Sequence, residues 1–415
     1  MASDDQISML NGSHMPTSGI STYQMNDRLF TPRFFLMCGF TFTVFLSAFQ
    51  LLPTAPFRIL SLGGSETVAG LFLGFLTYAS ALSAPFTGAL ADRLGKRRIL
   101  LVTSLAIAGF STTYAFVSSV PLMLGLVLVH GGFWSGLLTA SGAYLADLIP
   151  AHRRAEGLGY YGFSTLLAIA VAPSIGLWLF QFGWEVVCLS AALLNVAMAM
   201  IAWRLRELRD VEATDAPLFS PDVFEWRVFG LSITLFLYSF GYGGVTSFVA
   251  LYATASGVAP PGMYFTVFAI VTMLTRPISG QLGDRLGHSR VLIPCLALIA
   301  AGYAMLAVSG TRPWLLASAV LFGIGFGSAY PVFAAYVLQR VDTRRRGAAF
   351  GGILAAFDTG IGTGSITMGW IIHRFGFGAA FGAAACLAAL SIPYFLYSAG
   401  RVTWTTSTSP VKFSS

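Results

Sequence analysis

The sequence predicts an all-α membrane protein with twelve transmembrane helices arranged as two pseudo-symmetric six-helix bundles. First, the 415 residues are 56% hydrophobic and only 10% charged, with a mean hydropathy of +0.74, whereas soluble domains carry about 25% charged residues. Second, apolar stretches of about 20 residues, long enough to cross a bilayer, recur along the whole chain. Third, one polar segment, residues 204–225, divides these stretches into two sets of six.

Hydropathy, interrupted by Pro, Gly and charged residues, sets the ends of the apolar segments. The first six spans are expected at 33–52, 67–91, 98–117, 121–147, 155–180 and 184–203. The second six are expected at 226–253, 262–283, 290–309, 313–339, 346–372 and 378–398. The predicted organisation is therefore a tail at 1–26, bundles at 27–203 and 226–400 joined by a cytoplasmic linker at 204–225, and a tail at 401–415.

The N-terminal tail is polar and lacks the apolar stretch of a signal peptide. Within it, Gly12-Ser13-His14-Met15 matches the scar that tag cleavage leaves in products of expression vectors. Residues 1–15 are therefore expected to be vector-derived, and the natural chain is expected to begin at Met15.

The positive charge orients the chain and does not indicate a nucleic-acid partner, although the net charge is +7. With both termini cytoplasmic, twenty of the 24 Lys and Arg residues fall on the inner side of the bilayer. Arg58, Arg312 and Arg374 fall outside, and Arg276 falls within a span. Because positively charged loops stay in the cytoplasm, we expect a multi-pass protein of a bacterial-type inner (plasma) membrane with both termini cytoplasmic.

An internal repeat supports the division into two halves. The segment GALADRLG at 88–95 recurs as GQLGDRLG at 280–287, 192 residues later. Arg153 and Arg154 recur within the arginines at 344–346, at an offset of about 191. Two motifs repeated at nearly one offset indicate duplication, which is a usual architecture of secondary transporters.

Residues 88–98 (GALADRLGKRR) match the loop pattern G-x-L-a-D-r-x-G-r-k of the major facilitator superfamily, between the second and third spans where that family has it. The chain resembles that family over its whole membrane portion. The resemblance implies the family's fold, alternating access and a charged latch on the cytoplasmic side. The residues that it assigns to this gating motif are Gly88, Asp92, Arg93, Gly95, Lys96, Arg97 and Arg98, with Gly280, Asp284 and Arg285 in the second half. The alternative is that these basic residues only anchor the loop.

The fifth span is similar to the antiporter motif g-x8-G-x3-G-P-x2-G-G of the same family. Ala172, Pro173 and Gly176 lie at its conserved end, where alanine replaces a glycine and Leu177 replaces the last one. Small residues and Pro make a thin, bent helix that can pack closely on a neighbour. The resemblance favours antiport over uptake.

Asp358 is the carboxylate predicted to couple transport to protons. It lies about 18 Å into the eleventh span, near the middle of a core of about 30 Å. A carboxylate there costs about 2.5–3.5 kcal/mol unless it is neutralised, paired or hydrated. The competing interpretation is a static ion pair with Arg276, the Arg that falls within the eighth span.

His130 is a second candidate for proton coupling. The drug-antiporter pattern R-x-x-q-G has Arg four residues before Gly, but here Gly131 follows His130 and the Arg position is Val127. His130 could replace that Arg as a proton relay or could bind substrate. Equally, it could be a neutral histidine hydrogen-bonded within the bundle.

The resemblance implies that the first, fourth, seventh and tenth spans line a central cavity. Aromatic walls with few hydrogen-bonding groups suit an amphipathic organic molecule. The predicted substrate-binding residues are Trp134, Gln50, Phe49, Tyr238, Tyr242 and Tyr330.

The sequence thus predicts a proton-coupled antiporter that exports a small amphipathic compound, such as a drug, siderophore or metallophore. A proton symporter and a non-transporting receptor or complex subunit are the alternatives. No enzyme or ATP-binding motif is evident, so we expect no enzymatic activity and no cofactor. The four cysteines are widely spaced, so no metal site is expected. The expected partners are the substrate, protons and the lipid bilayer, and the chain is expected to be a monomer.

Overall fold

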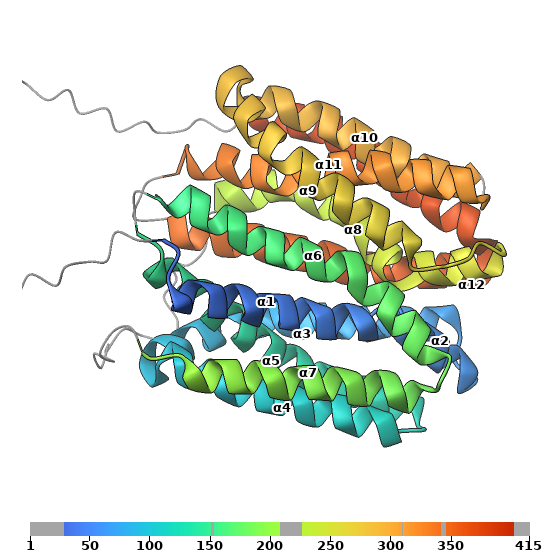
Figure 1. Ribbon diagram of the computed structural model, residues 1–415. Helices are drawn as coiled ribbons and strands as arrows, with labels where there is room; N and C mark the ends of the chain where they lie inside the picture. The colour runs from blue at the N-terminus through green and yellow to red at the C-terminus, as the bar shows by residue number, and fades with distance from the viewer. Residues whose placement is uncertain (1–28, 151–152, 208–225, 309, 342–345, 402–415) are drawn as a thin grey trace, which may run out of the picture.

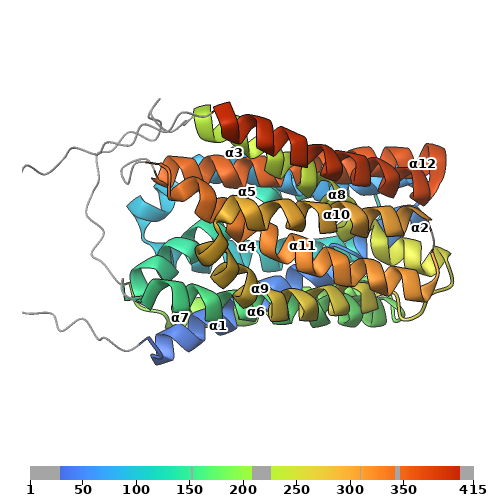
Figure 2. The same ribbon diagram turned by 90° about the horizontal axis from the view of Figure 1, so that it is seen from above.

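A computed structural model shows an elongated bundle whose helices run side by side (Figures 1 and 2). The structure describes residues 29–150, 153–207, 226–308, 310–341 and 346–401. All regular secondary structure in these ranges is helical. The predicted vector-derived segment, most of the 204–225 linker and nearly all of the C-terminal tail lie outside the described residues.

In the described residues before the linker there are seven helices. They are α1 (Pro32–Leu51), α2 (Ala55–Ser61), α3 (Glu66–Leu94), α4 (Lys96–Phe116), α5 (Val120–Leu148), α6 (Arg154–Phe180) and α7 (Trp184–Arg204). The short α2, which was not expected, follows α1 after a turn that contains Pro53. The N-termini of α1 and α3 are capped by hydroxyls, since Thr31 Oγ1 accepts from the Phe34 amide and Ser65 Oγ accepts from the Val68 amide.

In the described residues after the linker there are five helices. They are α8 (Trp226–Ala255), α9 (Met263–Leu286), α10 (His288–Val308), α11 (Arg312–Leu338) and α12 (Arg346–Arg401). Eleven helices of the described chain are long and apolar enough to span a membrane, the last of them covering 50 residues. That last helix contains non-helical backbone at Gly376 (φ 83°) and so corresponds to the two expected spans 346–372 and 378–398. The other helix ends agree with the expected spans within a few residues.

The two halves repeat the same packing. In the first half α3 packs on α5, α4 on α7 and α1 on α6; in the second half α9 packs on α11, α10 on α12 and α8 on α12. In Figure 1 the first half, blue to green, lies below the second, yellow to red, and α6 lies beside the second half.

Equivalent glycines make equivalent contacts in the two halves. A β-carbon added to Gly131 of α5 would collide with the Leu76 carbonyl of α3. At the positions 192 residues later, a β-carbon on Gly323 of α11 would lie 2.9 Å from the Phe268 carbonyl of α9. The 192-residue offset seen in the loop motif therefore also relates helix crossings deep inside the two halves.

Gly95 and Gly287 join α3 to α4 and α9 to α10 with the same backbone geometry. Their φ values are 92° and 91°, each with a ψ of 136°. An L-residue with a side chain rarely adopts this conformation. The glycine of the repeated motif is thus required by the turn itself.

Two seams join the halves, α3 against the part of α12 before Gly376, and α6 against α9. In the first seam a β-carbon on Gly70 would collide with the Ser365 carbonyl. In the second, a β-carbon on Gly262 would lie 2.8 Å from Ser174 Cα. Gly70 and Gly262 are 192 residues apart and Ser174 and Ser365 are 191 apart, so the two seams are equivalent by the repeat.

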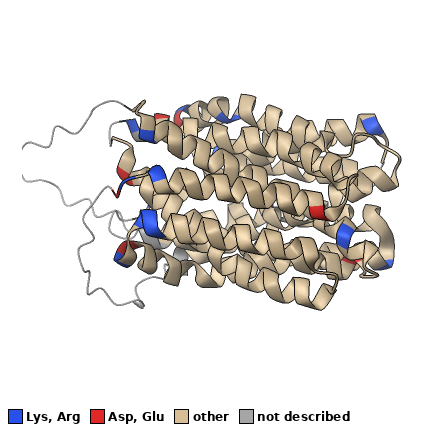
Figure 3. Cartoon of the chain, turned by 60° about the horizontal axis from the view of Figure 1, so that its bottom comes forward, with Lys and Arg blue, Asp and Glu red and all other residues tan. Residues whose placement is uncertain are grey.

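Charged residues gather at the two ends of the bundle (Figure 3). We call the end that carries the 93–98 loop and the start of α6 the basic end, and the end that carries α2, the start of α3 and Gly376 the far end. The contacts of the described residues across the seams lie mostly toward the far end. No residue of 66–80 in α3 is exposed, whereas many residues of 81–94 are. The halves are thus closed on each other toward the far end and uncovered toward the basic end.

Candidate functional site

Asp358 lies on α12 at mid-depth of the bundle, with a partly exposed side chain. Beside it, the Phe357 ring lies 5.0 Å from the Tyr330 ring of α11 and 6.0 Å from the Phe326 ring. Within the described chain, no hydrogen bond or ion pair holds the Asp358 carboxylate. A carboxylate at this depth without a partner is available to a proton or to a ligand.

Arg276 of α9 lies at a similar depth, but it does not pair with Asp358: the two are not among the ion pairs within 4.0 Å that the described residues form. The Tyr330 phenol interacts electrostatically with both groups. A β-carbon added at Gly162 of α6 would lie 3.2 Å from Arg276 Nη1. The guanidinium therefore reaches the other half of the molecule, and the static Asp358–Arg276 pair is absent from this conformation.

An aromatic cluster fills the second half next to these charges. The Tyr242 ring stacks on the Phe326 ring at 4.3 Å and also lies 6.5 Å from Phe357. Tyr238 is fully buried, and its hydroxyl has no hydrogen-bond partner among the described residues. Tyr242 and Tyr330, two predicted substrate-binding residues, thus lie in one cluster, and Tyr238 lies deeper in the packing.

His130 of α5 is buried in the first half and is 7% exposed. Its Nδ1 lies 3.2 Å from the Tyr114 hydroxyl, and its ring stacks on Phe110 at 5.4 Å. The Trp184 indole donates to the Tyr114 carbonyl at 2.8 Å. His130 Nε2 has no partner within the described chain. The imidazole is thus hydrogen-bonded within the bundle through Nδ1, while Nε2 is left unsatisfied by the described residues.

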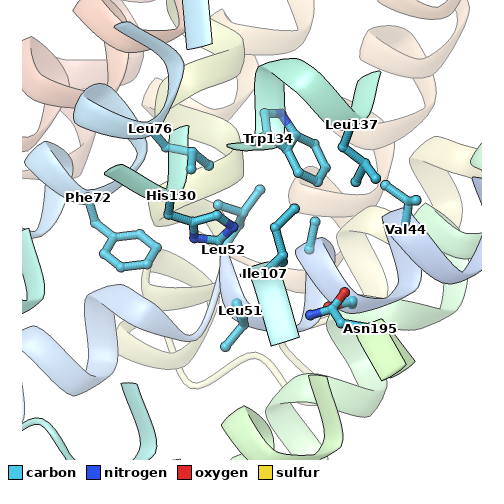
Figure 4. Close-up of a pocket in the computed structure, with 12 residues that line it drawn as sticks. Val44, Leu51, Leu52, Phe72, Leu76, Ile107, His130, Trp134, Leu137 and Asn195 are labelled. Atoms are coloured by element: carbon cyan, nitrogen blue, oxygen red, sulfur yellow. The ribbon is translucent and has the colours of Figure 1, made fainter. Parts of the chain in front are cut away.

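A small pocket lies against His130 (Figure 4). The His130 imidazole and the Trp134 indole point toward it from α5, and Asn195 faces it from α7. Asn195 also donates to Ser111 Oγ at 3.0 Å. The other lining residues are almost all apolar: Val44, Ser47, Ala48, Leu51, Leu52, Phe72, Leu76, Ile107 and Leu137.

Two predicted substrate-binding residues of α1, Gln50 and Phe49, are buried against neighbouring side chains of the first half. Gln50 is 2% exposed, and its Oε1 accepts a hydrogen bond from Ser190 Oγ at 3.1 Å. Phe49 is buried, with its ring 6.3 Å from Phe45, which in turn meets Trp134 edge-on at 6.1 Å. In this conformation Gln50 and Phe49 contact other parts of the first half.

The antiporter-like motif packs in the way that small residues permit. A β-carbon on Gly176 would lie 2.7 Å from the Gln50 carbonyl, so α6 and α1 are in backbone contact there. Ala172 and Pro173 are buried at the same level. Contact with the second half comes from neighbouring positions, since the Thr266 hydroxyl of α9 donates to the Ala170 carbonyl at 2.6 Å.

The loop motif at the basic end forms charged contacts within the first half. Lys96 forms an ion pair with Asp147 at the end of α5. Glu207 accepts hydrogen bonds of 3.1 Å from the Lys96 and Arg97 amides, and so caps α4. Asp92 is exposed and forms no hydrogen bond or ion pair with the described residues. The structure thus ties Lys96 and Arg97 to α5 and α7.

The equivalent loop of the second half is less connected. Asp284 is exposed and its carboxylate lies 3.7 Å from His288 Nε2, a pair that is ionic only when the imidazole is protonated. His288 occupies the position equivalent to Lys96. Arg98, Gly280 and Arg285 are exposed, and Gly88 of the first half is only partly buried.

Sequence reasoning missed the polar contacts of the far-end seam. His373 Nδ1 of α12 lies 2.8 Å from Glu66 Oε2 of α3, and the Tyr78 and Thr363 hydroxyls lie 2.6 Å apart. The Ser365 hydroxyl donates to the Gly70 carbonyl at 2.9 Å. The polar and small residues of the second and eleventh spans were the available signal, but their partners lie about 300 residues away.

Comparison with known proteins identifies the family. The family model described as Major Facilitator Superfamily matches residues 36–263 and again 231–412. An uncharacterised MFS-type transporter of Methanocaldococcus jannaschii is 25% identical over 81% of this chain and 90% of its own length. One from Burkholderia mallei is 27% identical over 85% of this chain and 89% of its own.

Solved structures agree in fold. A mutant of the nucleoside transporter NupG superposes with a TM-score of 0.72 at 15% identity, covering 89% of this chain and 99% of that one. The human organic anion transporter MFSD10 (TETRAN) gives 0.69 at 17% identity, covering 88% and 100%. With the doubled match of the family model, these findings mean that the chain belongs to the Major Facilitator Superfamily: it is a multi-pass membrane protein and a secondary transporter of a small molecule, not an enzyme.

Proposed function

We propose that the protein is a proton-coupled antiporter that exports a small amphipathic organic compound across the inner membrane by alternating access. The observation that carries this proposal is Asp358, a mid-depth carboxylate without an ion-pair partner among the described residues, next to the aromatic rings of Phe357 and Tyr330. A carboxylate so placed can take up a proton and release it when its access changes.

The seams define the conformational change in this proposal. The basic end, with its arginine-rich loops, corresponds to the cytoplasmic side. Contacts toward the far end then close the external side, and the uncovered faces of α3 and α9 toward the basic end open the site to the cytoplasm. Export requires the seams to part while the gating-motif loops approach each other.

The remaining predicted residues take supporting roles. Tyr330 and Tyr242 border Asp358, while Trp134 and His130 face the pocket of the first half. Both groups lie on the helices that the family uses to surround its substrate. The two solved structures named above are described as a nucleoside transporter and an organic anion transporter, so nucleosides and organic anions belong in a substrate screen.

The test uses acid-loaded inverted vesicles and a panel of amphipathic cations, metal chelators, sugars, nucleosides and organic anions. Addition of the substrate is expected to release protons in the wild type and in Glu185→Gln, which removes an exposed carboxylate. Asp358→Asn is expected to abolish this release while leaving the protein folded. Undiminished release by Asp358→Asn would exclude Asp358 as the coupling group, and proton movement in the same direction as substrate would identify a symporter.

A further inference from the structure

Arg276 is a partly buried cation that forms no ion pair with the described residues. It lies ten residues before the end of α9, about 15 Å from the basic end, so its side chain cannot reach the membrane surface along the helix. Thr272 and Ser279 are buried on the same face of α9, whereas Leu274 and Ile278 are 67% and 62% exposed on the opposite face. Arg276 therefore points into the protein and away from lipid.

The described acidic residues do not neutralise it. Apart from Asp358, they lie at or beyond helix ends: Glu66, Asp92, Asp147, Glu156, Glu185, Glu207 and Asp284. Asp358 is not within ion-pair distance of Arg276, and Tyr330 interacts with both. The guanidinium thus has no counter-ion among the described residues, although Asp358 and Tyr330 belong to its electrostatic surroundings.

The surroundings define which ligand group the guanidinium would bind. A β-carbon added at Gly162 of α6 would lie 3.2 Å from Arg276 Nη1, so the guanidinium lies directly against the other half of the molecule. The Tyr330 hydroxyl can donate a hydrogen bond, and the Phe357 ring lies 5.0 Å from the Tyr330 ring. A planar guanidinium binds carboxylate, sulfonate and phosphate groups through two parallel hydrogen bonds.

We propose that the substrate is an organic anion with a ring or other flat apolar body, whose acidic group binds Arg276 and Tyr330 between the halves. This inference rests on the proposed transport function and narrows its substrate class. It assigns to Arg276 a role in substrate binding, and leaves the proton to Asp358.

The test measures binding without any ion gradient, on full-length protein in lipid nanodiscs. The probes are three compounds with one ring body, 2-naphthoate, 2-naphthamide and 2-naphthylmethylammonium, with empty nanodiscs as the blank. Wild-type protein is expected to bind 2-naphthoate most tightly. Arg276→Gln is expected to raise the Kd for 2-naphthoate about tenfold or more and to leave the amide unaffected, since only the anion uses the lost charge. Arg374→Gln, which removes an exposed Arg at the far end, is the matched control.

A second pair of variants covers the case in which Arg276→Gln does not fold. Gly162→Ala puts a methyl group against the guanidinium, and is expected to weaken 2-naphthoate binding. Gly159→Ala on the same helix meets nothing within 4 Å and is expected to have no effect. The proposal is overturned if the amide or the ammonium compound binds as tightly as 2-naphthoate, if no 2-naphthoate binds, or if both Arg276→Gln and Gly162→Ala bind it as the wild type does. Arg276-dependent binding without proton release in vesicles would instead refute the coupling mechanism alone.

Discussion

The two halves of the molecule share their packing and differ in their chemistry. At positions 192 residues apart, His130 of α5 corresponds to Phe322 of α11, and Trp134 corresponds to Phe326. The first half thus has a partly satisfied imidazole beside a pocket. The second has a closed aromatic stack at the same level, in which Phe322 and Phe326 are 4.9 Å apart.

The charged groups are distributed just as unevenly. Arg276 and Tyr330 correspond to Ala84 and Leu138 of the first half. Backbone contacts such as those of Gly131 and Gly323 tolerate no added atom, so both copies of the duplicated unit have retained them. Side chains that face the space between the halves are free to diverge, because they do not determine how the helices pack. Function is therefore expected to follow the asymmetric positions, and folding the symmetric ones.

The largest effect on stability is expected from exchanging the unlike core residues. Phe322→His would bury a polar ring without a partner among Tyr303, Phe268 and Phe326, which lie 4.9–5.3 Å away, at a cost of about 2–4 kcal/mol. The reciprocal His130→Phe removes an unpartnered nitrogen but also the hydrogen bond to the buried Tyr114 hydroxyl, and these opposing effects lead to an expected loss of about 1 kcal/mol in the free energy of unfolding. Thermal unfolding in detergent measures the stability of both variants. Equal losses of stability would contradict the expectation that the core of the second half tolerates a polar ring less well than the core of the first half tolerates an apolar one.

A smaller and symmetric effect is expected at the shared helix crossings. Gly131→Ala and Gly323→Ala each force a methyl group against a neighbouring carbonyl, which should cost about 1–3 kcal/mol in either half. Gly125→Ala, also on α5, meets nothing within 4 Å and serves as the control. If only one of the two crossing variants loses stability in the same unfolding assay, the crossings are not equivalent.

The smallest effect is expected at the far-end pair. Glu66→Gln weakens a contact whose side chains are 28% and 48% exposed, and such pairs contribute about 0.2–1 kcal/mol. The balance should shift toward separated far ends by no more than about fivefold. Spin labels at Ser61→Cys and Phe375→Cys, in protein whose exposed Cys386 is replaced, would report the distance. A complete opening would show that His373 and Glu66 hold the seam by themselves.

Much of the fold could be predicted because hydropathy and a repeated motif are local features of the sequence, which do not depend on contacts between distant residues. The helix ends agree with the expected spans to within a few residues, with α2 as an exception, since a seven-residue helix is too short to show a clear period. The loop that contains Gly95 was also expected, because its motif recurs at 280–287.

The site could be predicted only in part. Asp358 and Arg276 were evident as charges inside spans, but whether they meet depends on the rotation of α9 and α12, which spacing along one helix does not reveal. For the same reason Tyr114, the partner of His130, was not anticipated although it lies only sixteen residues away. The substrate, the proton coupling and the direction of transport stay predictions.

The glycine–serine contacts in the two seams also affect how easily protons can leak through the protein. Where Gly70 meets Ser365 and Gly262 meets Ser174, backbone touches backbone and the gap is narrower than a water molecule. Proton leakage through a protein needs an unbroken file of water, and each of these contacts excludes water from its own seam on the far-end side of Asp358. Tight seams of this kind are expected to limit proton leakage down the membrane potential in this conformation.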